Sequence, residues 1–370
     1  MRRSLVLPAL LAPLLLLAGC APTVPGATAA PPVPSDTPTP SPTETAAPAG
    51  LLECADLVGT DVIATALSAP GSTPDVTEAR EPSAELVDLA VDAAGGLTCS
   101  WRTGSAAGNP LEYRDGDDWT YVTVQVLPDA GTSWSAMLFG DSPVEERIDV
   151  AGIETAAACG DPGCAFSAPV GDSWVQVEMR SFNFAIGGSP FGSMPVDDIL
   201  ASLQPIAEST FQTVLDASAE QIDFPQAAPG SVEMKCDGAL DPQGIGFALG
   251  HDGFAYQDDH NATPSVLFLT GYAAYRASMY SCLGTDGDTM ITVGRELAPV
   301  LAAALEQPDT STGLEPVELQ GAADGEVAAR ACADTTSYCS VLFTIGSTAY
   351  QVESRQDAVG IAEAMIAQAR

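Results

Sequence analysis

Polar and apolar residues alternate along several short stretches of the chain, and the clearest of them runs from Trp119 to Leu127. Its apolar side chains share one side of a strand and its polar side chains the other: Val122, Val124 and Val126 against Tyr121, Thr123 and Gln125. A period of two is typical of an antiparallel strand with one face on a core and one toward solvent. The pattern therefore predicts a half-buried antiparallel strand.

The same criteria assign the other elements of this part of the chain. Helical spacing predicts helices over residues 54–67, 130–139 and 196–217, the last with a kink at Pro205. Alternating stretches predict strands over residues 98–102, 164–170 and 173–181. Gly171 and Asp172 separate the last two strands, so these form a hairpin.

A second series of elements follows in the same order. Predicted helices begin at Pro242 behind the cap residue Asp241 and cover residues 272–279, 295–305 and 357–367. Predicted strands cover residues 279–282, 289–293, 340–345 and 349–354. The shared order is helix, two strands, helix, two or three strands, helix. Because tight hairpins join the strands, we expect an α+β fold of two tandem pseudo-repeat domains, each an antiparallel sheet with helices packed on it.

Eight cysteines repeat their spacing along the chain and support this duplication. Cys54 and Cys99 are 45 residues apart and precede Cys159 and Cys164, whereas Cys236 and Cys282 are 46 apart and precede Cys332 and Cys339. The text around them also matches: Leu97-Thr98-Cys99-Ser100-Trp101 stands where Tyr280-Ser281-Cys282-Leu283 stands later. We therefore interpret residues 51–218 and 219–370 as two diverged copies of one domain.

The start of the chain predicts its compartment. Arg2 and Arg3 precede an apolar run from Leu5 to Leu17, which is the size of a secretory signal and short for a membrane span. The following Leu17-Ala18-Gly19-Cys20 resembles the lipobox of bacterial lipoproteins. The resemblance implies that residues 1–19 are a signal peptide, that Cys20 becomes the first residue and is acylated, for example with palmitate, and that the protein is anchored by lipid at the extracytoplasmic face of the cell membrane. An ordinary signal peptide cut nearby is the alternative.

In an oxidising compartment, an even number of cysteines indicates a disulfide framework. Four cysteines in each copy allow three pairings, and we favour the same one in both. It joins Cys54 to Cys99, Cys159 to Cys164, Cys236 to Cys282, and Cys332 to Cys339. A zinc site at Cys159 and Cys164 is disfavoured, because their spacing differs from the usual zinc motifs.

Composition and net charge restrict the classes of partner that the protein can bind. Residues 20–50 are rich in proline and threonine without apolar periodicity, so they are expected to be an extended tether behind the lipidated Cys20. The chain has a formal net charge of -36 at pH 7. So acidic a protein repels phosphate backbones and anionic lipids, so we exclude nucleic acid as a partner and assign membrane attachment to the lipid anchor alone.

A recurring pattern consists of Cys54, Cys99 with Trp101, Val150-Ala151-Gly152, and Cys159 with Cys164. It is similar to the pattern of small actinobacterial envelope lipoproteins of unknown function, and the resemblance covers most of residues 51–217 and more loosely the rest. The second copy departs from the pattern, since Gly284 stands where the first copy has Trp101. The resemblance implies a binding or accessory role at the cell surface and transfers no reaction.

Candidate metal ligands are few. His251 and His260 are the only histidines, and they bracket Asp252, Asp258 and Asp259, a set that could bind zinc or copper. Their spacing is not that of one helical face, and Gly253 favours a polar surface loop. Asp115, Asp117 and Asp118 could offer oxygens to calcium, but the rest of a calcium-binding loop is missing, and turn formation explains them.

Catalytic motifs are weaker still. No G-x-S-x-G occurs, and the only lysine, Lys235, has Val232 three residues before it instead of serine. We therefore expect a noncatalytic, cofactor-free protein that binds an envelope component or a membrane protein partner, through a cleft between the copies or the end of one sheet. A metal-dependent hydrolase or metal carrier built on His251 and His260 is the alternative.

Overall fold

The computed structural model describes most of the region that follows the tether. Described are residues 50–370 except 69–73, 81–82, 106–110, 112–117, 141, 146, 185–190, 228–235, 237–241, 251–253, 263–264, 307–313 and 334–335. The predicted signal peptide, Cys20 and nearly all of the tether lie outside the described residues. Residues 48–370 form one compact unit that contains both copies.

The first copy is built on a seven-stranded antiparallel sheet. Its strands are β1 (Thr77–Glu78), β2 (Leu97–Thr103), β3 (Thr120–Leu127), β4 (Arg147–Val150), β5 (Ile153–Cys159), β6 (Gly163–Val170) and β7 (Ser173–Ser181). Their order across the sheet is β1-β2-β3-β7-β6-β5-β4, and neighbouring strands pair antiparallel. Ala151 and Gly152, both at positive φ, make the tight turn between β4 and β5.

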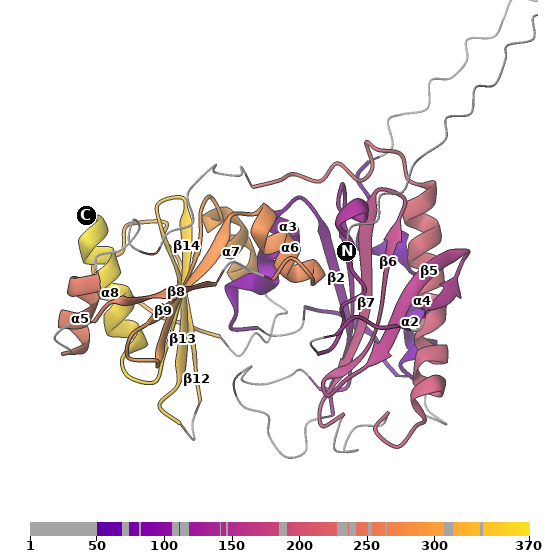
Figure 1. Cartoon of the computed structure of the whole chain (residues 1–370), viewed down its shortest axis with the longest axis horizontal. Coiled ribbons are helices and arrows are strands. Elements are labelled where there is room, and N and C mark those ends of the chain that lie inside the picture. The colour runs from indigo at the N-terminus through magenta and orange to yellow at the C-terminus, as the bar shows by residue number, and fades with distance from the viewer. Residues whose placement is uncertain are drawn as a thin grey trace, which may run out of the picture. The chain divides into compact units, whose positions relative to one another are not determined.

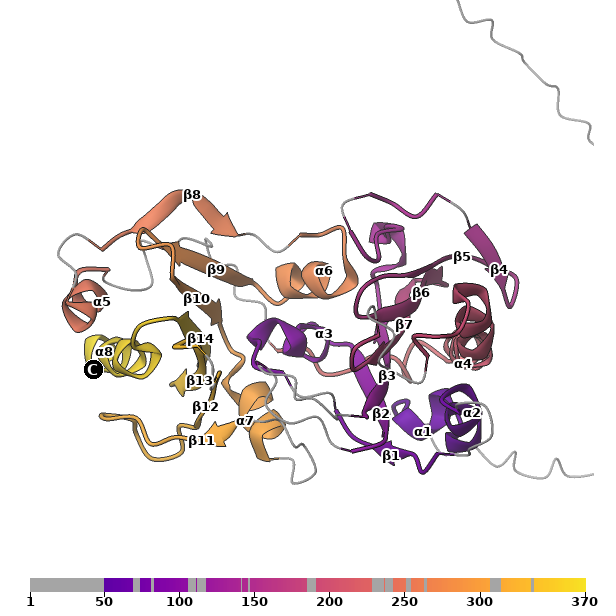
Figure 2. The ribbon, with the colours of Figure 1, turned by 90° about the horizontal axis from the view of Figure 1, so that it is seen from below.

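Helices cover one face of this sheet. They are α1 (Cys54–Leu57), α2 (Thr60–Ala66) and α4 (Val196–Asp216). Figure 1 shows α2 and α4 on that face, and Figure 2 shows all three together. The valines of β3 point to this side and pack with Leu203 and Phe211 of α4, which are fully buried. The predicted long helix is therefore confirmed, and it runs through Pro205 as a single element.

The second copy repeats the arrangement. Its strands are β8 (Tyr256–Ala262), β9 (Met279–Gly284), β10 (Thr289–Gly294), β11 (Glu315–Pro316), β12 (Ala328–Cys332), β13 (Cys339–Ile345) and β14 (Thr348–Ser354), in the order β11-β12-β13-β14-β10-β9-β8. The helices are α5 (Pro242–Leu249), α6 (Leu269–Arg276), α7 (Ala298–Glu306) and α8 (Ala358–Ala369). α8 packs its buried Ile361 and Met365 on one face of the sheet. Two antiparallel sheets with helices confirm the predicted α+β fold class, while the boundary between residues 218 and 219 stays a prediction.

Strand register makes the two copies comparable residue by residue. Cys99 pairs with Val124, which pairs with Val177, and Cys282 pairs with Ile291, which pairs with Val352. It follows that Val177 and Val352 are equivalent, and with them the residues on either side.

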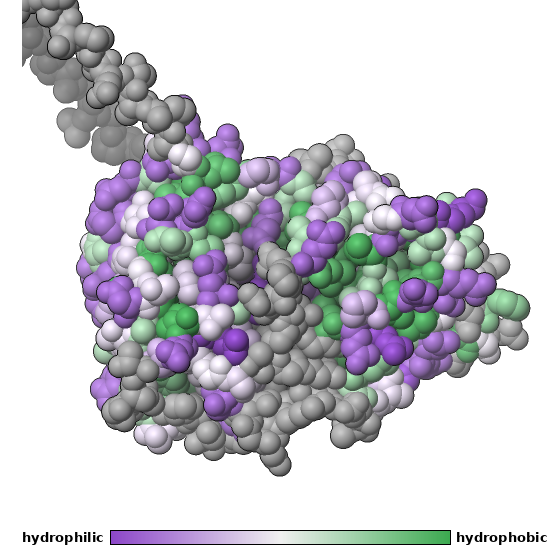
Figure 3. Space-filling model, turned by 180° about the vertical axis from the view of Figure 1, so that it is seen from behind, coloured by the Kyte–Doolittle hydropathy of each residue, from purple (hydrophilic) through white to green (hydrophobic). Residues whose placement is uncertain are grey.

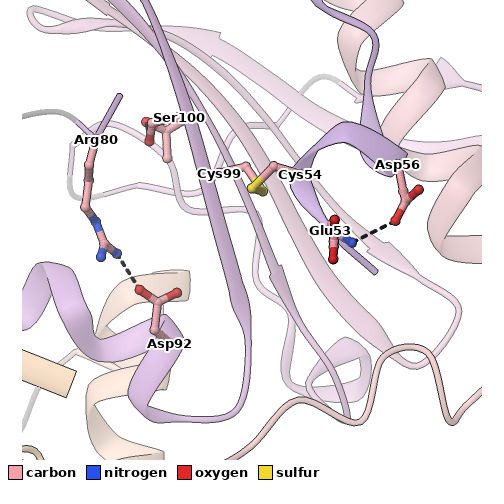
Figure 4. Close-up of a disulfide and its surroundings, with 8 residues drawn as sticks. Glu53, Cys54, Asp56, Arg80, Asp92, Cys99 and Ser100 are labelled. Atoms are coloured by element: carbon pink, nitrogen blue, oxygen red, sulfur yellow. Dashed lines mark hydrogen bonds and ion pairs between the residues drawn. A yellow bond between two sulfur atoms is a disulfide. The ribbon is translucent and has the colours of Figure 1, made fainter. Parts of the chain in front are cut away.

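Four disulfides join the cysteine pairs that the spacing favours. Cys54 at the start of α1 is linked to Cys99 on β2, with 5.4 Å between the Cα atoms, and Cys236 is linked to Cys282 on β9, with 5.7 Å. The short pairs, Cys159 with Cys164 and Cys332 with Cys339, bridge register partners on adjacent strands. Figure 4 shows the first of these links on one side of β2 and Ser100 on the other.

Two local predictions are wrong. Residues 130–139 form only a single turn of 3-10 helix, η2 (Gly131–Ser133), after which Trp134 has an extended backbone. The polar loop expected between His251 and His260 is in part the strand β8, which pairs with β9 across a register shift. Both errors have the same cause, because tertiary pairing overrides the weak local preference of small and polar residues.

The two copies are joined by a layer of short helices and by direct hydrogen bonds. The 3-10 helix η1 (Leu86–Leu89) and α3 (Ala90–Ala93) share one apolar cluster with α6, α7 and β14. Figures 1 and 2 show α3 and α6 side by side between the two sheets. Gln351 of β14 is 2% exposed; its amide donates to the Ala84 carbonyl at 2.8 Å and accepts from the Leu86 N–H at 2.9 Å. The Ser340 hydroxyl also donates to the Ala84 carbonyl, at 2.7 Å. One glutamine thus fixes the segment that leads into η1.

Replacing Gln351 by methionine tests this joint. The variant keeps the side-chain volume but leaves the buried Leu86 N–H without a partner, which costs about 1–3 kcal/mol. We expect the free energy of unfolding in urea to fall by that amount. The control is Gln176→Met, because Gln176 occupies the equivalent register position in copy one and donates to Glu178 on its own sheet. Its expected loss is under about 1 kcal/mol, and equal losses in the two variants would contradict the role of Gln351.

Candidate functional site

The face of the first sheet that looks away from α4 carries a polar cavity of about 100 Å³. Three neighbouring strands, β2, β3 and β7, supply its floor: Thr98, Ser100, Thr123, Gln125, Glu178 and Arg180. Its walls are Arg80, Ser83 and Asp88 from the segment around η1, and Thr270 from α6 of the second copy. The cavity therefore lies where the two copies meet.

The predicted alternation of β3 is confirmed, but the character of its second face is not. That face was expected to be solvated, whereas Tyr121 is 1% exposed and Gln125 is 8% exposed. Gln125 lies on the cavity floor, facing the η1 segment of copy one and α6 of copy two, whereas Tyr121 packs with Trp119 and Phe182. Polar side chains that the sequence places toward solvent line an enclosed site instead.

Hydrogen bonds order most of the cavity floor. Ser100 Oγ and Thr123 Oγ1 are 2.9 Å apart, and Gln176 Nε2 donates to Glu178 Oε2 at 3.1 Å. Thr98 Oγ1, by contrast, is buried without a hydrogen-bond partner among the described residues. A buried hydroxyl without a partner costs free energy, so a site is left for a polar group that could satisfy it.

Charged side chains surround the cavity in pairs. Arg80 contacts Asp92 of α3 at 2.6 Å, and Figure 4 shows this pair on the same side of β2 as Ser100. Arg180 lies next to Glu178 on β7, with 3.9 Å between Nε and Oε1. The side chains of Glu178 and Arg180 are 23% and 41% exposed, so the cavity is reachable from the surface.

Desolvation dominates the electrostatics of Glu178. Burial raises the pKa of this carboxyl above its ordinary value, the nearby Asp88 raises it further, and Arg180 and Gln176 offset only part of the increase. A carboxylate in this setting gains from any additional positive charge or hydrogen-bond donor.

Glu85 lies at the junction of the copies, between Ala84 and Leu86, which Gln351 holds. The residue keeps an exposed surface, yet it is surrounded by enough protein that desolvation raises its pKa to about 7. Asp88 and Glu353 of copy two raise this pKa as well, and Arg180 of copy one lowers it. Glu85 therefore responds to charges from both sheets.

The second copy carries a pocket at the equivalent place. Glu353 occupies the position of Glu178 and lies with Tyr338 and Arg355 in a pocket of about 320 Å³. It is 7% exposed, burial raises its pKa, and it accepts a hydrogen bond from the Tyr338 hydroxyl. The lining has changed, however: Leu283 and Met290 stand where the first copy has Ser100 and Thr123.

Neither pocket was identified from the sequence, although a repeated signal marks both. Gln176-Val177-Glu178 is followed by Arg180 two residues after the glutamate, and Gln351-Val352-Glu353 is followed in the same way by Arg355. The repeat of Gln, Glu and Arg at alternate positions places three polar side chains on one face of a strand. It could have been found by aligning the copies on their cysteines.

Most sequence-predicted candidates lie elsewhere. Cys20, His251, Asp115 and Asp117 are outside the described residues, and His260 is in β8. Within the part of the chain that the structure describes, no three His, Cys, Asp or Glu side chains are grouped as a metal site would require. Asp118 accepts hydrogen bonds from the Ser105 hydroxyl and backbone, which hold its pKa below the ordinary value.

The tryptophans have structural contacts. Trp101, Trp119 and Trp174 are each at most 4% exposed, as expected for core residues. Trp174 and the partly exposed Trp134 both donate to the Ser167 hydroxyl, at 2.9 and 3.1 Å. Trp174 also contacts the ring of Tyr272 on α6, so it contributes to the joint between the copies.

Comparison of the chain with protein-family models, curated proteins and solved structures finds no match.

Glu85→Gln tests the electrostatics of the junction. Folding raises the pKa of Glu85 from about 4.5 in the unfolded chain to about 7. Its contribution to stability is therefore fully present below pH 4.5 and is lost as the pH rises through about 7. The glutamine variant should match the wild type at pH 4.5 and melt about 1–3 °C higher at pH 8, after discounting for the exposed surface of Glu85. Thermal melts over this pH range measure the difference.

Glu154→Gln on β5 is the matched control, because Glu154 is exposed and its loss changes the net charge equally. If both variants show the same pH profile, the environment of Glu85 has no special effect.

Proposed function

We propose that this chain is a noncatalytic, lipid-anchored, extracytoplasmic binding protein. The polar cavity of copy one, named the Glu178 cavity after the glutamate on its floor, would hold a polar group of an envelope component or of a membrane protein partner. The observation that carries the proposal is the cavity itself. It is small, polar and reachable from the surface, and it is lined by residues of both copies. Convergent polar side chains in a cavity at a junction of domains are typical of a binding site.

The arrangement of the cavity favours binding over catalysis. Among its described lining residues there is no histidine, cysteine or lysine. The hydroxyls of Ser100 and Thr123 bond to each other, whereas a serine or threonine nucleophile needs a base beside it. The lining is suited to hold a ligand by hydrogen bonds and charge.

Attachment by lipid is supported by the sequence at Cys20 and by the proline-rich segment that follows. None of the described helices combines the length and apolar character needed to cross a bilayer. Figure 3 shows one face of the molecule, on which apolar residues are interspersed with hydrophilic ones. Such a mixed surface fits a domain held away from the membrane by a tether.

Cys20→Ala tests the anchor. Without the thiol that would be acylated, the protein should lose incorporation of labelled palmitate and move from the membrane fraction to the soluble fraction. Cys54→Ala, which removes a cysteine of the folded region, is the control and should keep the label. Retention of label and of membrane attachment by Cys20→Ala would contradict the anchor.

The double variant Ser100→Leu/Thr123→Met tests the cavity. The variant gives copy one the residues that copy two has at these positions and fills the polar floor with apolar side chains. Crosslinks that the wild type forms on intact cells should then fall at least about tenfold, which is the effect of losing one charge-assisted hydrogen bond. The reciprocal variant, Leu283→Ser/Met290→Thr, is the matched control and should keep the wild-type crosslinks.

Thermal melts of the purified variants check folding, and Thr123→Met alone is used where the double variant is unstable. Unchanged crosslinking in a folded, filled variant would place the partner somewhere other than this cavity.

A further inference from the structure

Carboxylates outnumber arginines at the junction of the copies. Around the cavity of copy one the acids are Glu85, Asp88, Asp92 and Glu178, and the arginines are Arg80 and Arg180. The excess is negative even when every arginine is counted as a partner. It has the same sign as the whole chain, whose formal net charge is -36, so the local and the long-range fields both favour a cation and disfavour an anion.

The arginines nearest the cavity already have acidic partners. Arg80 contacts Asp92 at 2.6 Å, and Arg180 lies 3.9 Å from Glu178. Asp88 lines the cavity near Glu85 and Glu178, and its negative charge raises the pKa of both glutamates. The cavity lining thus holds two arginines and two acids, and with Asp92, the partner of Arg80, the acids exceed the arginines by one.

Hydrogen-bond acceptors are concentrated on the cavity floor. The oxygens of Thr98, Ser100, Thr123, Gln125 and Glu178 line it together. Thr98 Oγ1 is buried and has no partner among the described residues. An ammonium group brings three N–H donors and one positive charge in a compact volume, and so matches both the unsatisfied acceptor and the acidic excess.

From this geometry we infer that the Glu178 cavity binds the primary ammonium group of an amine-bearing ligand, with Glu178 and Asp88 supplying the charge and the floor hydroxyls accepting its N–H groups. The inference rests on the proposed binding function and names the chemistry of its ligand. A metal ion fits less well, because no described trio of acidic, His or Cys side chains is grouped to hold one.

The size of the cavity sets how much of the ligand enters. Its volume of about 100 Å³ equals that of roughly three water molecules at about 30 Å³ each, which is enough for an ammonium group and the adjoining carbon atoms. The rest of the ligand would extend to the surface past Glu178 and Arg180, whose side chains are partly exposed at the opening. An amine on a chain or peptide therefore fits, whereas a bulky quaternary ammonium does not.

Isothermal titration of the folded protein with n-pentylammonium tests the inference. We expect one site per chain, with no binding of n-pentanol, which lacks the charge, or of tetramethylammonium, which lacks N–H donors. Glu178→Gln should weaken binding by about tenfold or more, since it removes a hydrogen bond to a charged group and half of the acidic pair. Thermal melts establish that the variant is folded.

Glu353→Gln is the matched control, because Glu353 holds the equivalent position in copy two, where Leu283 and Met290 replace two of the hydroxyl-bearing residues. It should bind the amine as the wild type does. Equal binding of pentanol, or loss of binding in Glu353→Gln but not in Glu178→Gln, would overturn the inference.

Absence of any amine binding would overturn it too. That result would leave the proposed function to be decided by the cell crosslinks, so the two failures can be told apart.

Discussion

The side-chain amide of Gln351 is the contact on which the arrangement of the two copies depends. It satisfies the Ala84 carbonyl and the Leu86 N–H in a place with 2% solvent exposure, where both groups would otherwise be costly. Because the segment between them contains Glu85 and leads into η1 and α3, the same contact decides where the wall of the Glu178 cavity stands. A single polar side chain thus connects the packing of the second sheet to the chemistry of the first.

Duplication explains why the two sheets offer different sites on one plan. Register equivalence places Gln176 and Gln351, and Glu178 and Glu353, at matching positions of β7 and β14. In copy one the glutamine stays on its own sheet and donates to Glu178, whereas in copy two it reaches the other copy. The floor residues diverged in parallel, from Ser100 and Thr123 to Leu283 and Met290. Copy one therefore has a polar cavity on this face of its sheet, whereas copy two uses the equivalent face for the contact of Gln351 that joins the copies.

The sequence predicts the fold well because most of the fold is local. Period-two alternation identifies β3, β7 and β14, Gly171 marks the hairpin between β6 and β7, and cysteine spacing favours the pairs that the disulfides join. The site is different in kind. Alternation shows that Thr123 and Gln125 share a face, but burial of that face depends on α6 and η1, and the contact between Leu86 and Gln351 spans 265 residues. No local window contains that information, so the polar face looked like a solvated one.

Keeping buried acids at the junction has a cost in stability that the rest of the chain must offset. Glu178 and Glu353 are both desolvated enough to raise their pKa values, so their ionised forms disfavour folding at neutral pH. On the chain-entropy model, the two long disulfide loops contribute about 4 kcal/mol each and the two short ones about 2 kcal/mol each. The long links join Cys54 and Cys236 to β2 and β9, strands that also contribute residues to the two pockets. Disulfides on one face thereby stabilise a sheet whose other face carries buried charge. A sheet selected for stability alone would have apolar residues in place of those acids.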